Sequence, residues 1–336
     1  MNRKLCSILL FSFLIVVLSC QREHEKIDLV SINVEINIHR FEQDLFKLNA
    51  DSLGSSIPML KSSCGDFLNL FGEQLIGIGR LDEPGYTGNL KKFITDKQVL
   101  ESFGKVDEVF PSLDPLNGIL TDAFKRYHYY FPEKEIPAVY SFISGFNQSI
   151  VIADSILAIG LERYLGRDCK YYDLLGIPRF ISYNMHPQKI PSDCMRSWAI
   201  GEFPFNDSID NLANNIIYEG MLIYFTKKML PDEPDSIILG FSPSQMEWCK
   251  NNEKNIWTHL IENRLLFNDD SFIISKLINS APFTSGFPQE SPGRTAVWTG
   301  YRIVQSFMKN NEGITFPDLM KITDYQSILN RSKYKP

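Results

Sequence analysis

The chain has 336 residues, of which 44% are hydrophobic and 22% are charged. This length and this balance exclude a disulfide-stapled miniprotein and a globally disordered chain, and they predict a folded protein with a sizeable core. The 40 acidic and 34 basic side chains give a formal net charge of −6 without a long basic patch, so nucleic acid is not an expected partner.

The first residues have the pattern of a secretory signal. Arg3 and Lys4 precede an apolar run, residues 5–18, that is short for a hydrocarbon core of ~30 Å. Ser19-Cys20 then resembles a bacterial lipobox, in which the signal is cleaved before the cysteine and the thiol receives a lipid. We therefore expect a signal peptide over 1–19, lipidation at Cys20, and a polar tether up to residue 29. The alternative is an ordinary signal peptide followed by a chance cysteine.

The cysteines after the tether have spacings that match no zinc ribbon. They are Cys64, Cys169, Cys194 and Cys249. Export to an oxidising compartment permits disulfides among them, with three possible full pairings, and four free thiols are the alternative.

Residues 30–336 are predicted to form a single domain, because no repeat or linker requires a second one. Alternating apolar residues from Val30 to Ile38 predict a strand. Two β-rich runs, 137–145 and 149–153, are separated by three residues and predict a hairpin, and residues 157–160 predict a third strand. We therefore expect a small antiparallel sheet packed on helices.

Helical spacing dominates the rest of the chain, so the expected fold class is α+β and mostly helical. The predicted helices cover about 57–76, 97–109, 117–130, 209–229, 243–266, 272–278, 295–309 and 316–329. Asp207 and Ser242 are candidate N-caps, and Gln245 can complete a capping box with Ser242. Residues 171–207 are expected to be rich in loops.

The helix predicted over 209–229 contains Tyr218-Glu219-Gly220, which has the frame of a zinc-peptidase helix. In such a helix two histidines at i and i+4 bind the metal, and the glutamate after the first is the general base. Tyr218 and Leu222 occupy the histidine positions here, and leucine has no lone pair for a metal. We therefore expect no metal, no cofactor and no catalytic residue, and we interpret Glu219 as a carboxylate paired with a base or a backbone amide.

The segment 291–304 is rich in aromatic residues and glycine. Arg294 is predicted to stand near a helix N-terminus, where the helix dipole disfavours a cation, so it should have a specific acceptor. Trp298 and Tyr301 lie one turn apart, and Gly300 permits close approach of a neighbouring backbone. Core packing and a salt bridge explain these residues. The functional alternative is a recognition site that they line together with Glu219 and Tyr224.

Several short motifs, each weak alone, are informative in combination. In chain order they are the lipobox, Tyr130-Phe131-Pro132, residues 140–147, residues 157–161 with 164–166, Ile217-Tyr218-Glu219-Gly220, residues 245–249 with 252–253 and 256–257, and Pro292-Gly293-Arg294 with Trp298 and Gly300. Together they resemble the gliding motility lipoprotein GldB family of Bacteroidetes, with Glu162 where relatives commonly have Asp. That family is in turn distantly similar to gluzincin-type zinc peptidases.

The resemblance implies a degenerate, zincin-like scaffold without metal, anchored by lipid in the cell envelope and associated with the gliding machinery and type IX secretion. The favoured function is non-catalytic binding of a protein or envelope partner in a groove lined by Glu219, Tyr224, Arg294, Trp298 and Tyr301. The alternative is a metal-dependent hydrolase of peptide or cell-wall substrate, with Glu219 as base and ligands such as His259 or His186. A third possibility is a purely structural envelope component. Gln21 after Cys20 favours the outer membrane as the destination.

Overall fold

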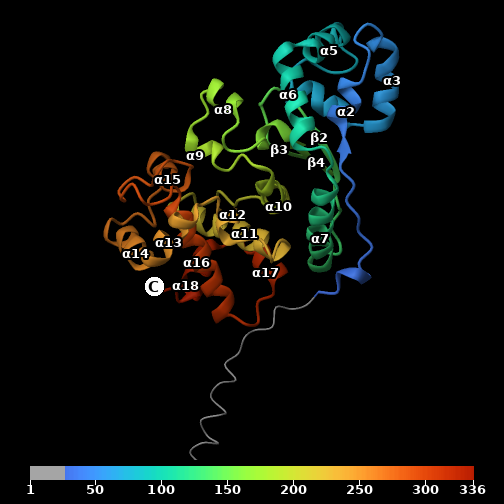
Figure 1. The fold of residues 1–336 in the computed structure, drawn as a ribbon. Helices are drawn as coiled ribbons and strands as arrows, with labels where there is room; N and C mark the ends of the chain where they lie inside the picture. The colour runs from blue at the N-terminus through green and yellow to red at the C-terminus, as the bar shows by residue number, and fades with distance from the viewer. Residues whose placement is uncertain (1–26) are drawn as a thin grey trace, which may run out of the picture.

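The computed structural model describes residues 27–336, so the predicted signal peptide, Cys20 and the first part of the tether lie outside the described residues. In Figure 1 the chain passes from a group of helices at one end, through a small sheet, to a larger group of helices. The expected α+β, mostly helical class is confirmed. The similarity to zincin-type peptidases stays a prediction. No helix in the described part of the chain is long and apolar enough to cross a membrane.

The start of the described chain differs from the predicted strand. Residues 29–31 form the 3-10 helix η1 (Leu29–Ser31), and the extended chain after it reaches only a two-residue strand, β1 (His39–Arg40). The amides of Ile36 and Ile38 donate instead to Thr121 Oγ1 and Asn117 Oδ1, at 2.9 and 3.0 Å. The prediction was wrong because side chains of a helix, rather than a neighbouring strand, satisfy this backbone.

A run of helices lies between β1 and the second strand of the sheet in sequence. They are α2 (Phe41–Phe46), α3 (Leu53–Cys64), α4 (Phe67–Leu70), the π-helix η2 (Phe71–Leu75), α5 (Tyr86–Thr95), α6 (Lys97–Val109) and α7 (Asp114–Tyr130). The predicted bounds of α6 are confirmed. Its N-cap, Asp96, accepts hydrogen bonds from the amides of Gln98 and Val99, a local signal that marks the start of a helix.

The sheet within the described residues has four strands in the order β1-β2-β4-β3, with β2 (Ala138–Phe142), β3 (Ile150–Ala153) and β4 (Ile156–Gly160). β2 pairs parallel with β1 and with β4, and only β3 and β4 are antiparallel. The sheet is therefore mixed, and the predicted antiparallel sheet is wrong. The hairpin joins β3 to β4, not β2 to β3 as the sequence predicted. Its connection has only two residues, Asp154 and Ser155, and such a tight turn explains why Asp154 has a positive φ of 45°.

The sheet separates two clusters of buried side chains in the described chain. Val139, Leu157 and Ile159 belong to the larger cluster, and Phe142 and Ala158 belong to the smaller one. Successive residues of a strand point to opposite faces, so each face of β2 and β4 supplies one core. The smaller cluster contains α2 to α5, and the larger one contains α7 and the helices that follow the sheet.

The stretch expected to be rich in loops is largely helical, which corrects that prediction. The helix η3 (Leu161–Tyr164) precedes it, and the stretch itself is covered by α8 (Lys170–Leu174), α9 (Arg179–Ser182), η4 (Pro187–Lys189) and α10 (Ile190–Glu202). Pro191 and Asp193 in the first turn of α10 are favourable at a helix start. Cys194 and Trp198 of α10 are buried at i, i+4 spacing, a helical stripe that the sequence reading overlooked.

The C-terminal half is a helical assembly around α11 and α16 (Figure 1). Its helices are α11 (Leu212–Met229), α12 (Asp235–Leu239), α13 (Pro243–Asn251), α14 (Glu253–Glu262), α15 (Ser271–Ile278), α16 (Thr295–Asn310), α17 (Phe316–Lys321) and α18 (Tyr325–Ser332). The capping box of Ser242 and Gln245 is confirmed, whereas α11 is capped by Asn211 rather than by Asp207. The predicted helices over 243–266 and 316–329 are each interrupted once.

Helices α11 and α16 cross with their backbones in contact. A Cβ atom on Gly220 or on Gly300 would overlap backbone atoms of the opposite helix, at Gly300 and at Ile216 respectively. The close approach expected at Gly300 is thereby confirmed. Because α11 carries Glu219 and α16 begins after Arg294, this crossing places the two predicted site residues near each other.

A charged cavity around Glu219

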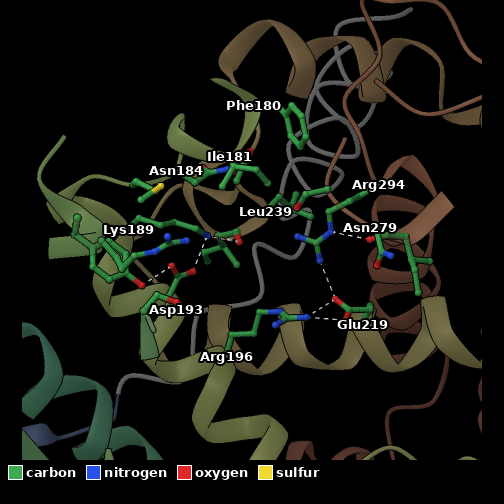
Figure 2. A pocket seen from close by; sticks show the side chains of 18 residues that line it. Phe180, Ile181, Asn184, Lys189, Asp193, Arg196, Glu219, Leu239, Asn279 and Arg294 are labelled. Carbon is green, nitrogen blue, oxygen red and sulfur yellow. Dashed lines mark hydrogen bonds and ion pairs between the residues drawn. The ribbon is translucent and has the colours of Figure 1, made fainter. Parts of the chain in front are cut away.

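A cavity of about 380 Å³ opens between α9, α10, α11, α12 and the chain that leads into α16, and Figure 2 shows it from close by. Its lining combines apolar groups with charged ones. The charged residues are Arg163, Lys189, Asp193, Arg196, Glu219 and Arg294. Four cations therefore face two carboxylates in one partly enclosed space.

Glu219 is held by two arginines from different elements. Arg196 Nη2 donates to Glu219 Oε1 and Oε2 at 2.7 and 2.9 Å, and Arg294 Nη2 donates to Oε2 at 2.9 Å. The side chain of Glu219 is only 17% exposed. Burial favours a higher pKa for this carboxyl, but the two guanidinium groups outweigh that effect and hold its pKa below the ordinary value. Glu219 is thus an ionised carboxylate whose two oxygens both accept hydrogen bonds.

Arg294 reaches Glu219 from an unusual backbone conformation. It is the N-cap of α16 with a φ of 68°, in the left-handed region that costs a non-glycine residue of order 1 kcal/mol or more. Its Nε donates to the carbonyl of Ile278 at 3.1 Å, which fixes the plane of the guanidinium. The prediction that Arg294 has a specific acceptor is confirmed, and that acceptor is Glu219. Backbone strain at a residue that lines a cavity is typical of functional sites.

Lys189 provides a buried cation on the opposite wall. Its ammonium donates to the carbonyls of Ile237 and Ile238 and to Ser192 Oγ, at 2.7, 3.1 and 3.1 Å, and lies 3.3 Å from Asp193 Oδ1. Burial lowers the pKa of Lys189, and Asp193 opposes this effect. Tyr164 Oη donates to the other oxygen of Asp193 at 2.9 Å. Protein groups thus satisfy both the Lys189 ammonium and the Asp193 carboxylate, and the two side chains form a rigid wall of the cavity.

A second cavity of about 330 Å³ adjoins the first one. Phe180, Asn184 and Leu239 are among the residues that line both. The second cavity adds Tyr183, Phe241, Gln245 and Pro292 to the lining. The second cavity is also lined by Arg179 and Arg294, so the two cavities share a charged boundary and the second one adds aromatic and amide groups.

The structure brings together only two of the five predicted binding residues. Glu219 and Arg294 line the cavity, whereas Tyr224, Trp298 and Tyr301 are not among its lining residues. Trp298 and Tyr301 are each 3% exposed and pack in the larger core. Tyr224 lies beside the ring of Phe316 on another face of α11. Glu219 and Tyr224 are five residues apart on this helix and are therefore rotated by about 140° from each other, so they do not line the same cavity.

Sequence reasoning missed the other charges of the site. Lys189, Asp193 and Arg196 lie in the stretch expected to be loop, although their i, i+4, i+7 spacing would have placed them on one face of a helix. Arg163 follows Glu162 in η3, a segment in which sequence reasoning singled out Glu162 but not Arg163. These residues come to Glu219 through tertiary packing.

The cavity residues do not fit a zinc centre. Within residues 27–336 no group of three or more histidine, cysteine, aspartate or glutamate side chains could hold a metal ion. His186 hydrogen-bonds to Gln188, and the ring of His259 packs on Phe287; neither lines the cavity. Cys64, Cys169, Cys194 and Cys249 are free thiols.

The fold and the site define a mostly helical α+β protein with a charged cavity organised around an arginine-bridged carboxylate. The chain belongs to the family described as gliding motility protein GldB, whose family model matches residues 22–336. This confirms the resemblance found in the sequence, and the chain is accordingly a protein associated with gliding motility. No curated protein and no solved structure matches it.

Proposed function

We propose that this chain is a lipid-anchored accessory protein of the cell envelope, which acts in gliding motility and its accompanying type IX secretion. In this proposal it binds a protein or envelope partner through the Glu219 cavity and catalyses no reaction. Family membership supports the association with gliding. The lipobox at Cys20 supports the anchor, and Gln21 after it supports the outer membrane as the destination.

The observation that carries the non-catalytic proposal is the double pairing of Glu219. A general base needs a pKa near the working pH. Both oxygens of Glu219 instead accept hydrogen bonds from Arg196 and Arg294, and these cations hold its pKa low. A planar carboxylate between two guanidinium groups is a recognition geometry, because it fixes the positions of the remaining donors.

The metal-dependent hydrolase is the weaker candidate for the same reason. It would need Glu219 released from both arginines and nitrogen ligands beside it, whereas His186 and His259 lie outside the cavity. Turnover of a peptide or cell-wall substrate that is sensitive to chelators and abolished by Glu219→Gln would overturn the non-catalytic proposal.

Crosslinking in intact membranes, followed by purification of the full lipidated chain, tests partner binding. Phe180 lines both cavities and is only partly buried, so Phe180→Ala should change the site without unfolding the protein. We expect this variant to lose most of the captured partner. Phe267→Ala is the matched control, because Phe267 is 62% exposed and lines neither cavity.

Two outcomes would contradict partner binding at this cavity. One is the absence of any captured protein with the wild-type chain. The other is equal capture by wild type and Phe180→Ala. A Cys20→Ala variant separately tests the anchor, and it should move the protein out of the membrane fraction.

A further inference from the structure

We infer that the cavity binds a C-terminal carboxylate of an extended peptide segment, held by donors of Arg163, Arg196 and Arg294. This inference rests on the proposed function, because it specifies what the bound partner presents to the site. It follows from the charge balance of the lining, from the hydrogen-bond donors that have no acceptor, and from the shape of the adjoining cavity.

The charges of the lining are not balanced. Glu219 is shared between Arg196 and Arg294, and Asp193 is the carboxylate nearest Lys189. Arg163 has no carboxylate partner among the described residues, and its Nη1 donates to the carbonyl of Phe146 at 3.3 Å. Positive charge held away from water is unfavourable unless an anion joins it, so the site favours an added carboxylate.

Two guanidinium nitrogens of the lining are buried without an acceptor in the described chain, Arg163 Nε and Arg196 Nε. Buried N–H groups of native proteins are nearly always paired, so such donors indicate a missing acceptor. In Figure 2 the guanidinium groups of Arg196 and Arg294 meet at Glu219, and Lys189 lies beside Asp193 on the other side of the same cavity. A carboxylate is the anion that matches guanidinium groups in a planar, bidentate manner.

The neighbouring surfaces suit a peptide that ends at this point. Ile181, Ile238 and Leu239 line the charged cavity and can contact an aliphatic last side chain. The adjoining cavity, which Arg294 also lines, adds Tyr183, Phe241 and Pro292, with Gln245 as a polar group for the preceding peptide backbone. A free inorganic anion would use none of these contacts.

Titration calorimetry on the full, detergent-solubilised lipoprotein tests the inference with N-acetyl-Gly-Gly-Leu as the probe. The peptide with a free carboxylate should bind at least tenfold more tightly than its C-terminal amide, and its affinity should fall as salt is raised. Equal binding of acid and amide, no binding of the acid at millimolar concentration, or equally tight binding of inorganic phosphate would overturn the inference.

Variants locate the binding in this cavity. Arg163→Gln should lower the affinity for the acid peptide at least tenfold. Arg163→Lys keeps the charge without the Nε donor and should lower this affinity less. The matched control is Arg126→Gln, which removes an arginine of α7 outside both cavities and should leave binding unchanged. An unchanged affinity in Arg163→Gln would also overturn the inference.

The two proposals fail in different ways. If acid and amide peptides bind equally while partner capture still depends on Phe180, the carboxylate inference falls and the proposed function stands. If the acid peptide binds selectively but membranes yield no captured partner, the proposed function falls while the carboxylate site stands.

Discussion

At the scale of single residues, the loop after β2 depends on one buried acid, Glu162. Its Oε1 accepts hydrogen bonds from Ser144 N, Ser144 Oγ and Phe146 N at 2.6, 3.0 and 3.2 Å. Its Oε2 is buried and has no partner in the described chain. Since Arg163 follows it directly, Glu162 links the loop 143–149 to the wall of the cavity.

Glu162 should make folding stability depend on pH. Burial raises its pKa from 4.5 to about 7, against the opposing effect of its hydrogen bonds. Between these two values the folded state keeps a proton that the unfolded state releases, so the free energy of unfolding should fall as pH rises, by about 3 kcal/mol in total. Glu162→Gln should remove this contribution. Urea unfolding from pH 4.5 to 8 measures it.

The control for this prediction is Glu101→Gln on α6, whose side chain is 48% exposed. It should leave the pH dependence of stability as in wild type. If the Glu162→Gln and wild-type profiles run parallel between pH 4.5 and 8, Glu162 does not titrate in this window.

At the scale of elements, the crossing of α11 and α16 sets the geometry of the site. Gly220 and Gly300 let the two backbones touch. Gly220 directly follows Glu219 in α11, and Gly300 lies six residues after Arg294, the N-cap of α16, and both Glu219 and Arg294 line the cavity. A larger residue at the crossing would separate the helices. The separation would also stretch the 2.9 Å contact between Arg294 and Glu219.

Gly300→Ala should therefore destabilise the protein by about 3 kcal/mol or more, because its Cβ would overlap the carbonyl of Ile216 and the backbone cannot yield cheaply. Gly118→Ala in α7 is the matched control, since nothing lies within 4 Å of a Cβ there. Alanine at that helical position should stabilise by roughly 0.5–1 kcal/mol. Urea unfolding compares the two, and equal effects would show that the helices do not rely on this contact.

At the scale of the whole molecule, the sheet couples two cores of different size. The smaller one, around α2 to α5, includes Phe67, whose ring stacks on Tyr140 of β2 with centroids 4.4 Å apart. The cavity belongs to the other side, on helices of the larger core. We therefore expect the N-terminal helices to be able to loosen without direct change to the site.

Phe67→Ala should cost about 3–5 kcal/mol and act mainly on the smaller core, because Phe67 is fully buried there. Hydrogen exchange should accelerate in α2 to α5 before it accelerates in α11 and α16. Phe225→Ala, in the larger core, should instead raise exchange in α11 and α16. Uniform acceleration by both variants would contradict two separately loosening cores.

The sequence by itself determined the features that depend on neighbours along the chain. The bounds of α6 and the capping box of Ser242 follow from local capping and spacing, and the combination of short motifs already indicated the family. The need of Arg294 for a specific acceptor, and the pairing of Glu219 with a base, were also predicted, because a buried or misplaced charge requires a counterion wherever it lies.

Only the tertiary structure decided which groups meet. The order of the strands depends on hydrogen bonds between segments far apart in the chain, so local alternation could not distinguish a β2–β3 hairpin from a β3–β4 one. Likewise Arg196 reaches Glu219 from α10, whereas Trp298 and Tyr301 turn into the core. Composition and spacing specify which charges need partners, but the packing of helices selects the partners, because that choice depends on distances through space.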